Sequence, residues 1–167
     1  AIGTDLGTIW KPFPRLILNG ALWYLYLEQE FVYVGDAGIV EPSGETNRAG
    51  ADFGLRYQIN DWLFFNLDAN YTYARSINEP DGENYIPLAA DFTSTGGLSV
   101  QNWNNFSGGL RYRYLADRPA NEDNSIVAEG YFISDFNVNY TYDKVIFGVS
   151  IENIFNSEWN ETQFATE

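Results

Sequence analysis

Residues 48–59 read RAGADFGLRYQI, and this stretch decides the fold. Its odd positions carry apolar side chains, among them Phe53, Leu55 and Ile59, while its even positions carry polar side chains or glycine. Successive side chains of a strand point to opposite faces, so this period of two predicts a strand with one apolar and one polar face. A helix, at about 3.6 residues per turn, would scatter the apolar set around its axis.

The same alternation returns along most of the chain, which therefore predicts about eight strands and no helix. No apolar run approaches the roughly 20 residues that a membrane-spanning helix needs. The clear repeats lie at residues 63–73, 106–114, 132–142 and 145–151, and weaker strands are expected at Ile2–Trp10, Arg15–Tyr33 and Phe92–Gln101.

The connections between these strands alternate between short and long. Short links of this kind are hairpin turns, so consecutive strands are antiparallel and all short turns lie at one end of the sheet. Sorting of loops by length is typical of an antiparallel up-and-down transmembrane β-barrel, with short periplasmic turns and long extracellular loops. The short links are residues 12–14, 60–61, 102–105 and 143–144, and the long ones are 34–46, 76–91, 116–130 and the stretch from Asn153 onward.

Composition excludes several classes of function. The net charge is −14, and most of the acidic residues fall in the long loops, so the chain is a poor partner for nucleic acid. Without cysteine or histidine there is no disulfide, no thiolate or imidazole metal site and no Ser-His-Asp triad. Neither an enzymatic activity nor a cofactor is expected. The first residues carry no signal-peptide pattern, so any export signal is expected outside this stretch.

Two other interpretations of the same pattern remain. In a soluble β-barrel that binds an apolar ligand, the apolar faces would point inward and the polar faces into water. A small passive outer-membrane barrel, a porin or an adhesin, would share the outward apolar face. Tyrosines near strand ends on the apolar face favour a membrane interface, and glycines on the polar face favour a wide, occupied lumen. Charged residues of the polar face are expected to pair across strands: Arg48, Asp52, Arg56, Asp68, Arg111, Arg113 and Asp135.

Several segments resemble the barrel of TonB-dependent outer-membrane receptors. The stretch Arg48–Asp52 is similar to that family's R-x-G-x-E/D strands, and Asn70–Ala74 to its "nYtyt" strand. Gly109–Tyr112 follows in the expected order, and Val149–Asn156 is similar to the v-x-N-L-F-N/D motif near the family's C-terminus. The order and spacing of these segments cover nearly the whole chain.

The resemblance implies that residues 1–167 are the C-terminal portion of a larger barrel of about 22 strands, without the plug domain and without the last strands. It also implies an outer-membrane receptor of a Gram-negative bacterium that imports a scarce nutrient: a siderophore-bound iron, haem, cobalamin, a glycan or a peptide. The implied partners are outer-membrane lipid, the nutrient, and the TonB complex through a plug domain not in this chain. Whether a surface lipoprotein caps the barrel is left open.

Loops on a rigid scaffold usually carry recognition, so the ligand-binding candidates come from the long loops and the polar face. The acidic stretch Asn78–Asn84 offers oxygen ligands for Ca²⁺ but lacks the spacing of a calcium loop, and a solvated turn at Pro80–Gly82 is the preferred interpretation. No metal site is therefore predicted. The candidate ligand-binding residues are Arg111, Arg113, Arg118, Asp81, Tyr85, Glu122 and Asp123.

Overall fold

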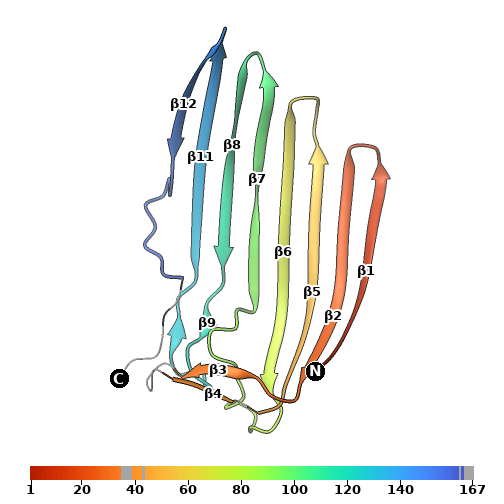
Figure 1. The fold of residues 1–167 in the computed structure, drawn as a ribbon, viewed down its shortest axis with the longest axis vertical. Helices are drawn as coiled ribbons and strands as arrows, with labels where there is room; N and C mark the ends of the chain where they lie inside the picture. The colour runs from red at the N-terminus through yellow and green to blue at the C-terminus, as the bar shows by residue number, and fades with distance from the viewer. Residues whose placement is uncertain (35–38, 43, 162, 164–167) are drawn as a thin grey trace.

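The computed structural model describes residues 1–167 except 35–38, 43, 162 and 164–167. Its main feature is one eight-stranded antiparallel sheet in the order β1-β2-β5-β6-β7-β8-β11-β12, in which each strand pairs with the next along the sheet (Figure 1). The expected eight-stranded, up-and-down arrangement is thereby confirmed. The strands are β1 (Ile2–Phe13), β2 (Leu16–Leu27), β5 (Thr46–Gln58), β6 (Leu63–Ser76), β7 (Phe92–Trp103), β8 (Phe106–Leu115), β11 (Tyr131–Tyr142) and β12 (Val145–Ile151).

Two short hairpins lie within the long connections and were not predicted. The first pairs β3 (Phe31–Val34) with β4 (Ile39–Pro42), and the second pairs β9 (Arg118–Pro119) with β10 (Val127–Ala128). The single strand expected at Arg15–Tyr33 is therefore wrong, because β2 ends at Leu27 and β3 belongs to a separate sheet. The break coincides with Glu28, Gln29 and Glu30, three consecutive polar residues that interrupt the alternation, and pairing of β2 with β5 ends just before them at Leu27.

All short turns lie at one end of the sheet and all long loops at the other (Figure 1). The turns use residues that accept a left-handed backbone: Asn104 and Asn105 have positive φ between β7 and β8, as Asn102 does near the end of β7, and Asp143 has it between β11 and β12. At the same end, the rings of Trp62 and Trp103 stack with centroids 5.0 Å apart. An aromatic pair beside tight turns suits the level where a membrane meets water.

Register places the apolar side chains in continuous rows across the sheet. Leu98 pairs with Leu110, Leu110 with Phe136, and Phe136 with Ile151, so one face presents an uninterrupted apolar row. These side chains stay exposed, with Leu110 at 44%. The full row across eight strands is Phe13, Leu16, Tyr57, Phe65, Leu98, Leu110, Phe136 and Ile151.

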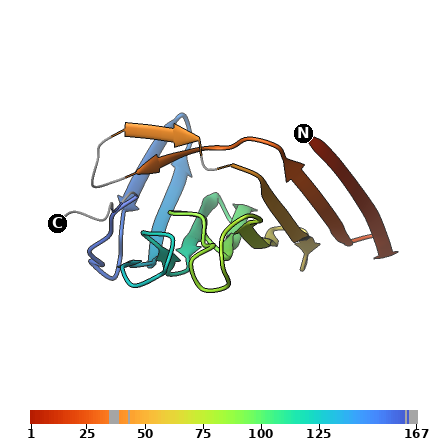
Figure 2. The same cartoon turned by 90° about the horizontal axis from the view of Figure 1, so that it is seen from below.

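The opposite face carries the polar residues, again in register. Arg56 pairs with Asn66, Gly97 with Arg111, and Arg111 with Asp135. The sheet is curved (Figure 2), and a cavity of about 710 Å³ opens along the polar face of β1, β2, β5, β6 and β7, which makes that face the concave one. The polar residues therefore lie on the concave side of the sheet, and the apolar row lies on its convex side.

Close approach between neighbouring strands explains why position 97 on the concave face is a glycine. A Cβ placed on Gly97 would lie 2.2 Å from the backbone oxygen of Leu110 on β8, a distance that no real side chain tolerates. At Gly50 a Cβ would meet the indole ring of Trp23, which covers this glycine from β2. The small residues of the concave face therefore let backbones and one large ring approach closely.

Across the described residues, no helix has both the length and the apolar character required to cross a membrane.

Candidate functional site

Three long connections meet at the loop end of the sheet, where backbone bonds join the first two to each other and side-chain bonds join the third to the second. We call them the β6–β7 loop (residues 77–91), the β8–β11 loop (116–130) and the C-terminal segment (152–161). The amide of Leu88 donates to the carbonyl of Pro119 at 2.7 Å, and the amide of Tyr85 donates to that of Glu122 at 3.0 Å. These two bonds join the β6–β7 loop to the β8–β11 loop.

The first cleft lies between these two loops and has a volume of about 550 Å³. It brings together three of the predicted residues, Tyr85, Glu122 and Asp123, around an apolar floor of Ile86 and Pro87. Carboxylates dominate its rim, so it carries negative potential. The remaining lining residues are Ser76, Glu79, Glu83 and Asn121.

Asp123 is held in a small hydrogen-bonded turn of the β8–β11 loop. Its Oδ1 accepts from the Ser125 hydroxyl at 2.7 Å and from the Ser125 amide at 3.0 Å. The hydroxyl bond, followed by the amide bond, lowers the pKa of the Asp123 carboxyl below its ordinary value. Asn121 completes the turn by donating to the Ser125 hydroxyl oxygen at 2.8 Å. This carboxylate is thus ionised and fixed in position at neutral pH.

Asp81 does not line this cleft. It lies in the exposed turn at Pro80–Gly82, which the amide of Glu83 closes by donating to the Pro80 carbonyl at 3.0 Å. The expected solvated turn is therefore confirmed. Within the residues whose positions are given, no group of three or more carboxylates is arranged to hold a metal ion.

The second cleft opens on the concave face between β8, β11 and the C-terminal segment, with a volume of about 430 Å³. Arg111 and Arg113 line it from β8, as predicted candidates of the polar face. The guanidinium carbon of Arg113 lies 5.4 Å from the ring centroid of Trp159, and its Nη1 is 3.5 Å from a carboxylate oxygen of Glu161. Asp135 and Glu152 line the same cleft, so it presents two guanidinium groups and two carboxylates beside the indole ring of Trp159.

The C-terminal segment is placed over this cleft by a break in the sheet. Asn153 adopts a left-handed backbone (φ 49°), and its amide donates to Oδ1 of Asp135 at 2.8 Å. Its side chain both donates to the carbonyl of Ser157 and accepts from the Ser157 amide, each at 2.9 Å. The chain consequently turns away from β12 and carries Trp159 back toward β8.

Arg118 is placed differently from the other candidates. It is only 3% exposed, and its guanidinium donates to the carbonyl oxygens of Glu129 at 3.4 Å and Glu161 at 2.7 Å. It lines neither cleft. Arg118 therefore links the β8–β11 loop to the C-terminal segment.

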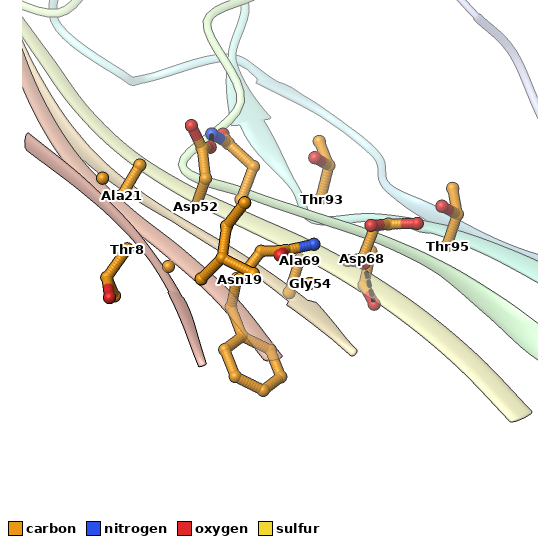
Figure 3. Close-up of a pocket in the computed structure, with 15 residues that line it drawn as sticks. Thr8, Asn19, Ala21, Asp52, Gly54, Asp68, Ala69, Thr93 and Thr95 are labelled. Carbon is orange, nitrogen blue, oxygen red and sulfur yellow. Dashed lines mark hydrogen bonds between the residues drawn. The ribbon is translucent and has the colours of Figure 1, made fainter. Parts of the chain in front are cut away.

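The third cavity is the one on the concave face of β1, β2, β5, β6 and β7, and Figure 3 shows the side chains that line it. Asp52 accepts a hydrogen bond from the Asn70 amide, and Asp68 pairs with Arg56, whose Nη2 is 2.8 Å from both carboxylate oxygens. Of the expected cross-strand pairs, Arg56 with Asp68 is therefore confirmed. Thr93 and Thr95 add hydroxyl groups beside them (Figure 3).

Sequence reasoning missed several partners. Arg48 pairs with Glu30, which also accepts from the Thr46 hydroxyl at 2.7 Å, rather than with a residue of a neighbouring strand of the sheet. Trp159 and Glu161 were not predicted beside Arg113, because only the turn at Asn153 brings them there. In the sequence, the signal for that turn is the Val149–Asn156 motif, which contains Asn153.

A search of curated proteins finds no match to this chain. Among solved structures, the ferric citrate transporter FecA in its unliganded form superposes with a TM-score of 0.79 at 15% identity, over 98% of this chain and 28% of that one. The ferric yersiniabactin uptake receptor FyuA from Yersinia pestis gives 0.75 at 12% identity, over 93% of this chain and 24% of that one.

The siderophore receptor PiuA from Acinetobacter baumannii gives a TM-score of 0.71 at 17% identity, over 93% of this chain and 24% of that one. The chain thus spans about a quarter of the length of these structures, and at such identities the likeness shows the fold. The family model described as "TonB dependent receptor-like, beta-barrel" matches residues 1–154. The chain belongs to the TonB-dependent receptor β-barrel family.

Proposed function

We propose that the chain is the C-terminal part of the barrel of a longer outer-membrane transporter, which imports a ferric chelate with energy delivered through TonB. Members of this family are outer-membrane proteins of Gram-negative bacteria, and they are transporters rather than enzymes. The observation that carries the proposal is the two-faced sheet, with its apolar row outward, its polar wall on the concave side and all long loops at one end.

Each proposed partner is matched to the surface whose chemistry suits it. Outer-membrane lipid meets the apolar row that contains Leu110 and Phe136. The nutrient enters from the loop end and reaches the two clefts. TonB acts through a plug domain that lies outside this chain, and a surface lipoprotein over the loop end stays a prediction.

The second cleft supports an anionic ligand most directly. Arg111 and Arg113 both line this cleft and both are exposed, so they can bind an anionic group next to the carboxylates of Asp135 and Glu152. Trp159 offers a ring face for a planar group. An iron chelate with carboxylate or catecholate groups combines these properties, which is the reason for placing this nutrient class first. The names of FecA (ferric citrate), FyuA (ferric yersiniabactin) and PiuA (siderophore) also favour placing ferric chelates first.

A passive barrel is the second candidate, because it would have the same outward row. The soluble barrel finds less support, since it requires Leu110 and Phe136 to meet other apolar side chains in a dry centre, and both are exposed in the described part of the chain.

The test is uptake of radioactive iron by cells whose own ferric chelate receptors have been deleted and which express the complete receptor gene. The chelators are citrate, a catecholate and a hydroxamate, and haem and cobalamin serve as competitors. We expect uptake of at least one ferric chelate, abolished by deletion of tonB and weakened by Arg113→Gln, with Arg15→Gln as the control at the opposite end of the sheet. Uptake that is equal without tonB would identify a passive barrel, and binding of haem or cobalamin alone would reassign the nutrient.

A further inference from the structure

The packed interior of the described chain lies under the loops rather than within the sheet. Through the middle of the sheet one face looks outward and the other faces the concave cavity, so few side chains are covered on both sides. The buried apolar residues instead cluster near the loop end, where Ala120 is 7% exposed and Ala128 is 1% exposed. Ile86 of the β6–β7 loop and Ile133 at the loop end of β11 are also buried, at 5% and 3%.

Arg118 lies in this interior as a cation whose described partners are carbonyl oxygens. Burying a guanidinium costs free energy unless hydrogen bonds replace its water. Here the replacements come from two separate parts of the chain: the Glu129 carbonyl, at the end of its own loop, and the Glu161 carbonyl of the C-terminal segment.

The backbone beside Arg118 binds the third connection. The carbonyls of Pro119 and Glu122 accept from Leu88 and Tyr85 of the β6–β7 loop. The short hairpin of β9 and β10 holds these carbonyls in place, because Ala128 pairs with Arg118 and Val127 with Pro119. The β6–β7 loop is therefore attached to the β9–β10 hairpin by its backbone. The C-terminal part of the chain is attached through the Arg118 side chain and through Gln163, whose Oε1 accepts from the Glu129 amide at 2.6 Å.

We propose that Arg118 is a positioning residue that joins the β6–β7 loop, the β8–β11 loop and the C-terminal segment into one preassembled unit. Through the Glu161 carbonyl it fixes Trp159 over Arg113, and through β9 it fixes the Tyr85 side of the first cleft. The two clefts consequently keep one relative geometry before any ligand arrives. Their use as ligand sites rests on the proposed function; the coupling of the loops does not.

The experiment measures loop geometry in the complete receptor, purified in detergent without ligand. This chain has no cysteine, so once any cysteine elsewhere in the receptor is replaced, Asp81→Cys and Glu158→Cys, both at exposed positions, introduce two spin labels for a pulsed distance measurement. We expect one narrow distance distribution with Arg118 present and a broad one in Arg118→Gln. Arg111→Gln, which removes an exposed guanidinium from the same wall, is the matched control and keeps the distribution narrow. A narrow distribution in Arg118→Gln would overturn the proposal.

Hydrogen exchange gives a second measurement, and its first part uses only the unaltered receptor. In the unaltered receptor, amides of residues 84–88 and 153–161 should exchange together with those of 118–122, as one cooperative unit. In Arg118→Gln we expect exchange in all three segments to rise by about tenfold or more, since bonds to a charged donor are lost. Independent rates in the unaltered receptor, or a rise confined to 116–130, would contradict the coupling.

Radioactive iron uptake separates this inference from the proposed function. Uptake in the Arg118→Gln receptor should need a higher concentration of ferric chelate for half-maximal rate, while the maximal rate changes little. If the unaltered receptor takes up no iron at all, the proposed function fails while the distance and exchange results still decide the role of Arg118.

Discussion

Nη2 of Arg56 on β5 lies 2.8 Å from both carboxylate oxygens of Asp68 on β6, and the Arg56 Nη1 donates to the Leu67 carbonyl at 3.0 Å. The pair crosses the strands diagonally on the concave face, because Arg56 is in register with Asn66 and Asp68 with Gly54. Both side chains are nearly half exposed. Because both side chains are exposed, water competes with the ion pair for both charges, and the pair mainly holds the two side chains in place on the concave face.

Replacing Asp68 with Asn should therefore change stability only slightly. Because the pair is exposed, we expect a loss of less than about 1 kcal/mol in the free energy of unfolding. Urea titration of the complete receptor folded into lipid vesicles, followed by tryptophan fluorescence, measures this loss. A loss several times larger would show that the wall excludes water at this position.

Charge on the outward row should have a much larger effect. Leu110→Arg or Leu67→Arg places a cation among acyl chains and should cost roughly 2–4 kcal/mol. Asn70→Arg and Asn137→Arg, on the concave face of β6 and β11, are the controls and should be tolerated, since water and Asp52 or Asp135 are available there. Folding yield and unfolding free energy in the same vesicles compare the two sets, and equal effects would contradict the assigned facing.

The glycine at position 97 should not accept a side chain. In Gly97→Ala the new methyl group would lie 2.2 Å from the Leu110 carbonyl oxygen, so β7 and β8 must separate locally, at a cost of about 1–3 kcal/mol. Gly7→Ala, also on the concave face, meets nothing closer than 3.7 Å and is the matched control. Unfolding free energies that fall equally in the two variants would rule out the close approach as the cause.

The turn at Asp123 should depend on pH through one carboxyl. Its pKa is lowered in the folded loop, so ionisation stabilises the turn at pH above the ordinary value of 3.8, and this stabilisation is lost as the pH falls through the lowered pKa. Ser125→Ala removes the hydroxyl that contributes most, so the Asp123 pKa should rise toward its ordinary value. Carbon-detected NMR of labelled aspartate measures both pKa values, with Asn124→Gly as the control, because glycine keeps the left-handed backbone of that position. An unchanged pKa in Ser125→Ala would refute the assignment.

The main sheet could be predicted from the sequence because the face on which a strand's side chain lies depends only on its position in the local alternation. Each strand from Thr46 to Ile151 repeats apolar and polar residues with a period of two, and this period fixes which side chains share a face whatever the neighbours are. The alternation of turn and loop lengths then fixed the order of the strands. Both kinds of information are present in short windows of sequence.

The loop assembly could not be predicted in this way. The bonds from Leu88 to Pro119 and from Arg118 to Glu161 join residues far apart in the chain, and no period or composition signals them. An arginine in an acidic loop suggests an exposed ligand contact, and burial of Arg118 becomes visible only when β9, β10 and the C-terminal segment are placed together. For the same reason Arg48 was expected to pair within the sheet, whereas Glu30 comes from the connection between β2 and β3.

The central claim is that the row containing Leu110 faces acyl chains and the row containing Arg111 lines the lumen. Nitroxide labels placed singly along β8 in vesicle-embedded receptor test it, with relaxation by oxygen, which concentrates in lipid, compared with relaxation by a water-soluble nickel complex. The account predicts that labels at Leu110 and Tyr114 are relaxed mainly by oxygen and labels at Ser107 and Arg111 mainly by nickel. A reversed alternation, or none, would contradict it.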